Sequence, residues 1–427
     1  MTHLFLAAVL QLSLVAGAQE PNSTSSAPGG GPATRRGADA GTADPDEDVA
    51  ESTFSIRHST PSDQPLVRPT MDAFADLSTS EVRVGPVRAR YSLNVFGDVG
   101  LKFDSLAADH PSFFLGNVDL LLGLRLEQGF SGVAELRFGV TDSANGIAGA
   151  LGAIDLERFG LRWENENFFV EVGREHTEIG YWNNAWHHGI WLQPTYNRPR
   201  WIGFGETGLV PVHRIGAIAG VKVPLGPGEL KASISVNNSR GLTRPDVRNR
   251  ADLIDLKLLF GSVEYVGLFW RELRVGLSGI VDQIPATTTA TATARPTMPG
   301  AIDEGIASLY VAYVGALILV DAETFYVHQQ NGDKVWQNYG GFLVVTATWK
   351  ALSPFAMVER IWRTGGASPF FVPVAAGAIS TDDLTVNLGL RYDLSTWNAL
   401  KAEYRFTRSY DLKTQVHEVF LSWNFGL

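Results

Sequence analysis

The sequence contains no cysteine among its 427 residues. Without thiols the protein has no disulfide bonds, no thiolate metal ligands and no cysteine nucleophile. Charged residues are also scarce, at 19%, and the formal net charge is −10. Because nucleic acids and anionic membrane surfaces attract clustered Lys and Arg, this charge balance argues against either as a partner.

Long hydrophobic runs are absent as well. Beyond the first twenty residues, no uninterrupted apolar run approaches the roughly 18 to 20 residues that a membrane-spanning helix needs, which excludes a helical membrane protein. Yet 45% of the residues are hydrophobic, 11% are aromatic and 44 are glycine. That mixture is typical of strands with bulges and interfacial aromatic belts, and equally of a soluble β-sandwich.

The first 18 residues are typical of a signal peptide. Residues 4–15 are apolar, and Ala16-Gly17-Ala18 follows them as the small-x-small pattern that a signal peptidase cuts. Cleavage is expected before Gln19. The sequence therefore predicts an exported protein.

Residues 19–80 are expected to form a disordered periplasmic tail and a lead-in to the folded domain. Up to about residue 51 they are rich in Pro, Gly, Ser, Ala and Asp, with too few large apolar side chains to offset the chain entropy of folding. Residues 52–80 are transitional, and the sequence leaves open whether they lead into the folded domain or plug it. We assign residues 81–427 to that domain.

Segments of strict alternation reveal the secondary structure. Within residues 119–127, leucines at every second position point one way and polar or small residues the other, and only Leu121 breaks the pattern. The alternation returns in residues 134–141, 384–393 and 400–406. A period of two predicts β-strands with one apolar and one polar face. The charges in the last of these segments all share one face, so that face needs water or partners around it.

The strands number about sixteen, with fourteen to eighteen possible because residues 261–271 fit the pattern poorly. Their connections alternate between short and long, as in outer-membrane barrels with short periplasmic turns and long external loops. The predicted fold is all-β, a single transmembrane antiparallel β-barrel. In lipid every backbone group must be bonded within the protein, and a closed barrel leaves no edge. At this strand number the lumen should hold water.

The last strand carries the most specific signal. Its apolar face is Val419, Leu421, Trp423, Phe425 and Leu427. Alternating aromatics before a terminal apolar residue resemble the signal read by the outer-membrane barrel assembly machinery, with leucine where that signal usually has Phe. The resemblance implies this machinery, the lipid bilayer and lipopolysaccharide as partners, and the outer membrane of a Gram-negative bacterium as the location.

A connection of almost forty residues, 174–212, follows the fifth predicted strand. It contains several tryptophans, and a loop of this length with so many aromatics should fold on itself rather than extend into water. Its ionisable side chains are the candidate pore and constriction residues. They are Arg174, Glu175, Glu178, His187, His188, Arg198, Arg200 and Glu206.

The start of this connection carries a family resemblance. Val172-Gly173-Arg174-Glu175-His176-Thr177, followed by Gly180-Tyr181-Trp182-Asn183, resembles the VGxxxTPxG segment of phosphate-selective-porin-like barrels, with Glu178 in place of proline. In architecture, residues 85–427 are similar to the porin superfamily. The resemblance implies that the loop after the fifth strand folds into the lumen and narrows it, and it favours a homotrimer.

The predicted inward charges are mixed in sign. Phosphate selectivity would need closely spaced cations that outweigh dehydration, so this balance favours a general channel for small hydrophilic solutes or ions. Most of the charges should pair along the wall and stabilise the barrel rather than contact a solute. The predicted lumen-wall residues are Arg125, Glu135, Arg137, Arg162, Glu171, Arg391, Lys401, Glu403 and Arg405.

A metal site and an enzyme are two alternative interpretations of the sequence. His187 and His188, with Glu178 or Glu206, invite a metal site, but adjacent residues seldom point at one ion and no HxH or HxxxH spacing supports them, so we expect neither a metal nor a cofactor. No Ser-His-Asp cluster stands out, and the chain is longer than the known enzyme barrels, so we predict no enzyme. A transporter specific for an anion such as phosphate or for a hydrophobic compound, a barrel enzyme and an adhesin remain alternatives.

Overall fold

A computed structural model of the chain describes part of its length. All described residues belong to the second of the two units, Met1–Thr53 and Phe54–Leu427, into which the chain divides. The predicted signal peptide and almost all of the predicted tail lie outside the described residues. No described helix is long and apolar enough to cross a membrane. The described residues are 79–84, 87–105, 110–140, 151–187, 191–203, 208–240, 257–286, 300–366, 368 and 382–426.

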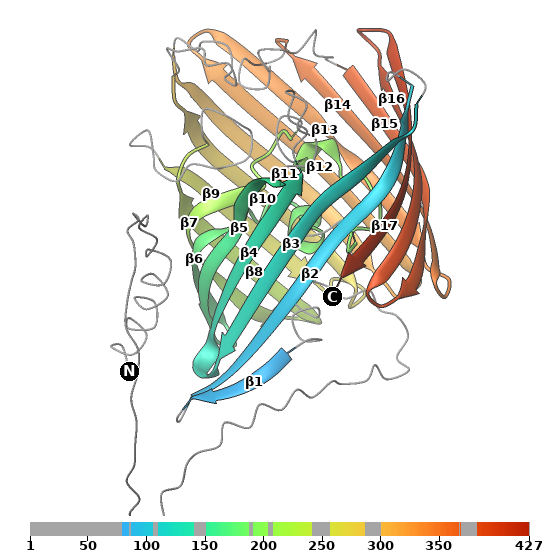
Figure 1. The fold of residues 1–427 in the computed structure, drawn as a ribbon. Helices are drawn as coiled ribbons and strands as arrows, with labels where there is room; N and C mark the ends of the chain where they lie inside the picture. Colours follow the sequence, from blue (N-terminus) through green and yellow to red (C-terminus); the bar gives the residue numbers. More distant parts are fainter. Residues whose placement is uncertain are drawn as a thin grey trace, which may run out of the picture. The chain divides into compact units, whose positions relative to one another are not determined.

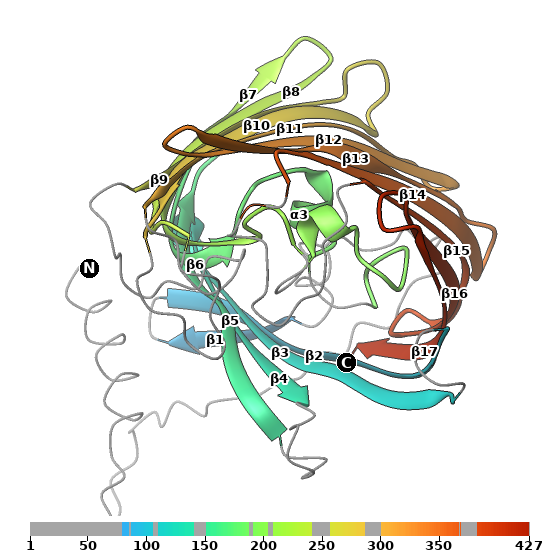
Figure 2. The same ribbon diagram turned by 90° about the horizontal axis from the view of Figure 1, so that it is seen from above.

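The described residues contain seventeen strands in one antiparallel sheet. Strands β2 to β17 pair in chain order, and β17 pairs back onto β2 from Glu418↔Asp104 to Gly426↔Phe96, so these sixteen strands close into a barrel (Figures 1 and 2). The extra strand, β1, forms a hairpin with the start of β2. The prediction of a single antiparallel barrel of about sixteen strands is confirmed.

The strands, which average more than ten residues, are long enough to be tilted across a bilayer. Two short helical turns, Glu127–Gly129 and Arg200–Ile202, and one helix, α3 (Tyr181–Ala185), complete the described elements. The strands are β1 Thr79–Val84, β2 Val87–Asp104, β3 Ser112–Leu126, β4 Phe130–Val140, β5 Leu151–Glu164, β6 Phe168–His176, β7 His213–Leu225, β8 Gly228–Asn237, β9 Leu258–Val266, β10 Leu273–Ile284, β11 Ile302–Val314, β12 Ile318–Asn331, β13 Lys334–Ala347, β14 Leu352–Thr364, β15 Asp382–Ser395, β16 Asn398–Ser409 and β17 Thr414–Gly426.

The connections sort by length between the two ends of the barrel. Short turns join β3 to β4, β5 to β6 and each later odd strand to the next even one, at the end where β2 begins and β17 stops. Most connections at the other end are longer, but β12 and β13 are joined there by only Gly332 and Asp333. Residues 261–271, which fitted the predicted alternation poorly, contain the end of β9 and a short turn at the expected end. Most of the connections therefore follow the alternation of short and long that is typical of outer-membrane barrels.

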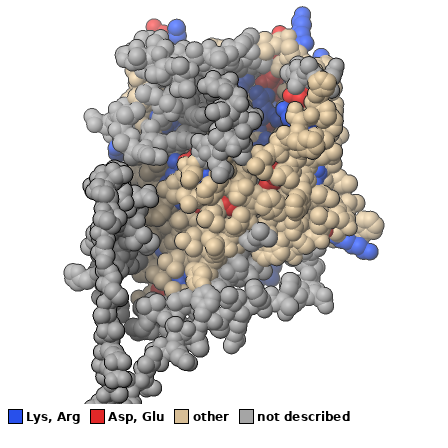
Figure 3. Space-filling model, in the orientation of Figure 1, with Lys and Arg blue, Asp and Glu red and all other residues tan. Residues whose placement is uncertain are grey.

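The two faces of each strand differ as the alternation predicts. On β15 the outward Leu388 is 51% exposed, whereas the inward Asn387 is fully buried. On β17 Trp423 faces outward and Asn424 inward in the same way. In Figure 3 the wall not covered by grey atoms is mostly tan, and most Lys, Arg, Asp and Glu atoms lie toward its upper and lower edges. An apolar outer wall of this kind suits contact with lipid.

One sector of the inner wall is apolar as well. On strands β10 to β14, large apolar side chains occupy inward positions and are buried, which requires something inside the barrel to cover them. Leu121, the one exception to the alternation on β3, also faces inward and packs with Trp191 and Leu192 of the long connection. The apolar residues of the inner wall of β10 to β14 include Ile280, Ile284, Ile302, Ile306, Phe325, Val327, Phe342, Val344, Met357 and Ile361.

Two arginine substitutions test whether the outer wall faces lipid. Leu388 lies near the middle of β15, and Leu394 lies on the same face beside the turn to β16. Since a charge costs most at mid-depth, we expect Leu388→Arg to lower the free energy of unfolding by about 2–4 kcal/mol and Leu394→Arg by about 0–1 kcal/mol. Denaturant titration in lipid vesicles measures both values. Equal costs at the two positions would contradict the assignment.

Candidate pore site

The connection between β6 and β7, residues 177–212, enters the barrel, and Figure 2 shows its helix α3 inside the ring of strands. It follows the fifth strand of the closed barrel, as predicted. The predicted start at residue 174 was wrong, because β6 continues to His176, so that Arg174 and Glu175 belong to that strand. His188 and Glu206 lie outside the described residues. We call residues 177–212 the inner loop.

The aromatic side chains of the inner loop pack on the apolar sector of the wall. The ring of Trp182 meets that of Phe342 edge-on at 5.9 Å between centroids, and Trp201 stacks on Phe325 at 5.2 Å. Both tryptophans are fully buried. Removing that much apolar surface from water contributes on the order of 4 kcal/mol per tryptophan, before the entropy of ordering the loop is counted. The apolar wall therefore holds this part of the loop against strands β12 and β13.

Carboxylates on the same side accept the loop's backbone hydrogen-bond donors. Glu323 on β12 accepts the N–H of Trp182 at 2.5 Å, and Glu359 on β14 accepts the N–H of Trp201 at 3.1 Å. Gly180, in the segment that resembles the porin motif, lies against Glu323, because a Cβ there would lie 2.0 Å from Glu323 Oε2. Its φ of +72° is a backbone conformation that favours glycine. Irregular backbone in a buried position needs such partners, and charged acceptors are the stronger ones.

Strands β15 and β16 hold the next part of the inner loop. The Lys401 ammonium donates to the carbonyl oxygens of Gln193 at 2.7 Å and Thr195 at 2.9 Å, and Glu403 accepts the N–H of Tyr196 at 2.6 Å. These wall charges were predicted to pair with one another, whereas here they bind the loop. The predicted wall residues that contact it are Arg391, Lys401, Glu403 and Arg405, and loop residue Arg200 reaches Asp383 on β15 at 3.1 Å.

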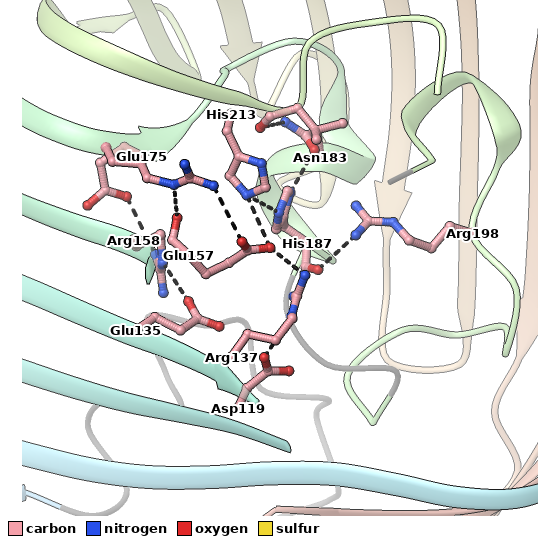
Figure 4. Close-up of polar contacts among 12 residues, drawn as sticks. Asp119, Glu135, Arg137, Glu157, Arg158, Glu175, Asn183, His187, Arg198 and His213 are labelled. Atoms are coloured by element: carbon pink, nitrogen blue, oxygen red, sulfur yellow. Dashed lines mark hydrogen bonds and ion pairs between the residues drawn. The ribbon is translucent and has the colours of Figure 1, made fainter. Parts of the chain in front are cut away.

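A β-bulge shapes the opposite flank of the lumen. Glu135 on β4 pairs with Arg158 on β5, but the next residue, Leu136, pairs with Leu156, so Glu157 is an extra residue in β5. A bulge of this kind re-aims side chains, and in Figure 4 Glu157 points toward His213 and the inner loop while Arg158 lies between Glu135 and Glu175. Arg158 Nε donates to Glu135 at 2.9 Å. Two consecutive charged residues thus reach the same interior network.

The inner loop adds its own charge to this network. Arg137 donates to Asp119 at 2.8 Å and to Glu157, and the loop residue Arg198 donates to the carbonyl oxygen of His187 at 3.1 Å. Burial, and then the like charge of Arg137, lower the pKa of the Arg198 guanidinium to about 9, so it stays protonated at neutral pH. Buried charges persist only when partners surround them, which explains why so many ionic groups gather here.

Polar cavities remain in the lumen between this network and the short-turn end of the barrel. One has a volume of about 560 Å³ and another about 410 Å³, and both are lined by Arg158, Arg162 and Lys222. Arg162 also pairs with Glu171 at 3.3 Å. The basic residues that line the two cavities are Arg90, Arg125, Arg158, Arg162, Lys222, Lys231 and Arg274, and the acidic ones are Glu164, Glu171, Glu175, Glu178 and Glu264.

The sequence reasoning missed the partners that hold the inner loop. It did not predict Glu323, Glu359 or the apolar inner wall of β10 to β14. It also did not single out His176 and His213, the residues on either side of the inner loop, which we call its neck. One signal was available: residues 342–345 are apolar at consecutive positions, as in strands covered on both faces. The bulge at Glu157 leaves no comparable trace in the sequence.

Comparisons with known proteins bear on the fold. In sequence, the chain matches no protein-family model and no curated protein. In structure, it is similar to the anion-selective porin from Comamonas acidovorans, with 12% identity, a TM-score of 0.55 and coverage of 79% of this chain and 100% of that one. It is also similar to OmpT of Vibrio cholerae, with 10% identity, a TM-score of 0.51 and coverage of 82% and 100%.

OmpF of Salmonella typhi, solved with daunomycin, is a third structural neighbour, at 11% identity and a TM-score of 0.51, with 79% of this chain and 98% of that one covered. At these identities the likeness concerns the fold. The chain therefore has a porin-like sixteen-stranded β-barrel, and the resemblance inferred from the sequence is confirmed at that level. The phosphate-selective subtype is not part of this finding.

A conservative substitution tests how the inner loop is anchored. Glu403→Gln removes the charge that accepts the Tyr196 N–H, and a hydrogen bond to a charged group contributes about 1.5–3 kcal/mol. Hydrogen exchange at the Tyr196 amide should therefore become roughly 10- to 100-fold faster. Glu272→Gln, in an exposed turn, serves as the control. An unchanged exchange rate at Tyr196 in the Glu403 variant would contradict this anchoring.

Proposed function

We propose that the protein is a passive diffusion channel for small hydrophilic solutes or ions, with the inner loop as its constriction. One observation carries the proposal: the inner loop is fastened across the lumen of a closed barrel, and cavities with charged linings persist beside it. A closed sixteen-stranded barrel is too wide for its own side chains to fill. The porin names of its structural neighbours support a channel rather than an enzyme.

The proposal also includes the location, insertion and oligomeric state of the channel. The apolar outer wall supports a place in the outer membrane of a Gram-negative bacterium, in contact with lipid and lipopolysaccharide. The alternating aromatic face of β17 favours insertion by the barrel assembly machinery. Export by a signal peptide and assembly as a homotrimer complete the proposal, the latter by resemblance to porins.

The charges that meet water favour anionic solutes over cationic ones. On the inner-loop side, the carboxylates of Glu323, Glu359 and Glu403 are buried and accept hydrogen bonds from the loop. The two cavities, by contrast, have more basic than acidic residues in their linings. The neighbouring lysines Lys222 and Lys231 face each other across β7 and β8. Fixed cations of this kind attract anions, so the channel should be weakly anion-selective.

Deleting the core of the inner loop tests its role as the constriction. A variant in which a short Gly-Ser linker replaces residues 181–201 should conduct more than the intact protein in planar lipid bilayers, because the obstruction is gone. Heat-dependent electrophoretic mobility shows whether the variant barrel has formed. Equal single-channel conductance of a folded variant and the intact protein would contradict the constriction, and no channels in either would contradict the channel itself.

Charge reversal in the cavities tests the selectivity. The reversal potential in a potassium chloride gradient should show chloride preferred over potassium in the intact protein, and the preference should invert in the double variant Lys222→Glu, Lys231→Glu. The matched control is Lys334→Glu, at the exposed turn between β12 and β13. A cation preference in the intact protein, or no change in the double variant, would overturn the anion proposal and leave the channel standing.

A further inference from the structure

Three histidines meet where the inner loop leaves the wall. His176 ends β6, His213 begins β7, and the two are direct partners in the register of these strands. The inner loop folds back to bring His187 between them, with its Nε2 atom 3.0 Å from Nε2 of His213. One ring nitrogen from each histidine lies within 4.8 Å of the others. His187 and His213 are fully buried, whereas His176 is half-buried and lines the smaller of the two polar cavities.

A neighbouring amide fixes which nitrogen of His187 carries a proton. The Asn183 side-chain nitrogen donates to the carbonyl oxygens of Thr177 at 2.7 Å and Val212 at 3.1 Å. Its oxygen must therefore be the atom that meets His187 Nδ1 at 2.8 Å, and an oxygen only accepts. His187 Nδ1 is thus the donor, and a neutral His187 presents the lone pair of Nε2 to His213. Metal-binding histidines are commonly oriented by such a bond to the other ring nitrogen.

We propose that His176, His187 and His213 bind a divalent transition-metal ion of the kind that prefers imidazole, with zinc as the representative. Two imidazole nitrogens at about 2.0–2.1 Å from a tetrahedral zinc lie about 3.3–3.4 Å apart, close to the distance between His187 and His213. His176 stacks on His187 at 3.6 Å between ring centroids. To become the third ligand, its ring turns away from this stacked position. Glu157, 3.5 Å from His213 Nε2, supplies negative charge beside the ion.

The surroundings tolerate an added cation. Arginines are close, since Arg137 and Arg174 contact Glu157 and Arg198 donates to the His187 carbonyl oxygen, but carboxylates accompany them. Arg137 also pairs with Asp119, and Arg158 pairs with Glu135. An ion here would join the ends of β6 and β7 to the inner loop at its neck, and Figure 4 shows His187, His213 and Glu157 converging at this point. The site goes beyond the channel proposal and does not depend on it.

Metal binding by the intact chain tests the site. Full-length protein without an affinity tag is purified in detergent, stripped with a chelator and equilibrated with zinc. We expect one zinc per chain by equilibrium dialysis, and X-ray absorption at the zinc edge should show nitrogen ligands at about 2.0–2.1 Å. Less than one zinc per chain, or a coordination shell without imidazole, would contradict the proposed zinc site before any substitution is made.

Matched substitutions locate the ion. His187→Gln and His213→Gln should each weaken zinc binding by about 100-fold, and Asn183→Ala, which removes the orienting bond, by about 10-fold. His328→Gln on β12, away from the cluster, should leave binding unchanged. Undiminished affinity in folded His187→Gln, the variant that leaves both strands intact, would contradict the proposal. Bilayer conductance is recorded separately, so a conducting protein without zinc overturns the metal site alone.

Discussion

Closure of the sheet is the constraint on which the rest of the structure depends. A strand edge cannot be left in lipid, because its N–H and C=O groups would lack partners. The pairing of β17 with β2 removes that edge. Sixteen strands then enclose more space than their own inward side chains fill, and this space must contain water, chain or both. The inner loop and the polar cavities divide it between them.

The inner loop is stable in the lumen because the two flanks hold it by different forces. On the β10 to β14 side, apolar wall residues cover its tryptophans, and buried carboxylates accept its backbone donors. On the β3 to β7 side, an ionic network of wall residues centred on the bulged Glu157 lies beside the loop, and His213 contacts the loop residue His187. Either flank alone would leave buried donors or charges without partners, which is costly. This arrangement also explains why the buried carboxylates of Glu323, Glu359 and Glu403 contribute little charge to the polar cavities.

Much of the fold could be predicted because period-two alternation depends only on neighbouring residues. The faces of β15, β16 and β17 and the strand number follow from it, and the aromatic content of residues 177–212 indicated a folded loop. The end of β6 was placed too early because its last residues, from Arg174 to His176, are polar and read as loop. The strand nevertheless continues through these polar residues because β7 pairs with it as far as His176↔His213.

The parts that could not be predicted depend on register between distant segments. A bulge turns Glu157 inward against the alternation, so no periodic pattern reveals it. His176 and His213 become neighbours only through the pairing of β6 with β7 across the whole inner loop. In the sequence His187 has only the adjacent His188 beside it, a spacing that argued against a metal, while the partners of His187 in the structure come from two strand ends. Leu121 was visible as an exception, but its reason, contact with Trp191, is tertiary.

Passage of an uncharged solute tests the central claim most directly, because it asks whether water crosses the barrel and does not depend on charge. Liposomes containing the purified protein are placed in an isotonic solution of a monosaccharide, and their swelling is followed by light scattering. The account predicts swelling that scales with the amount of protein and slows as larger sugars are used. Liposomes that swell no faster than protein-free ones, with the barrel shown to be folded, would contradict it.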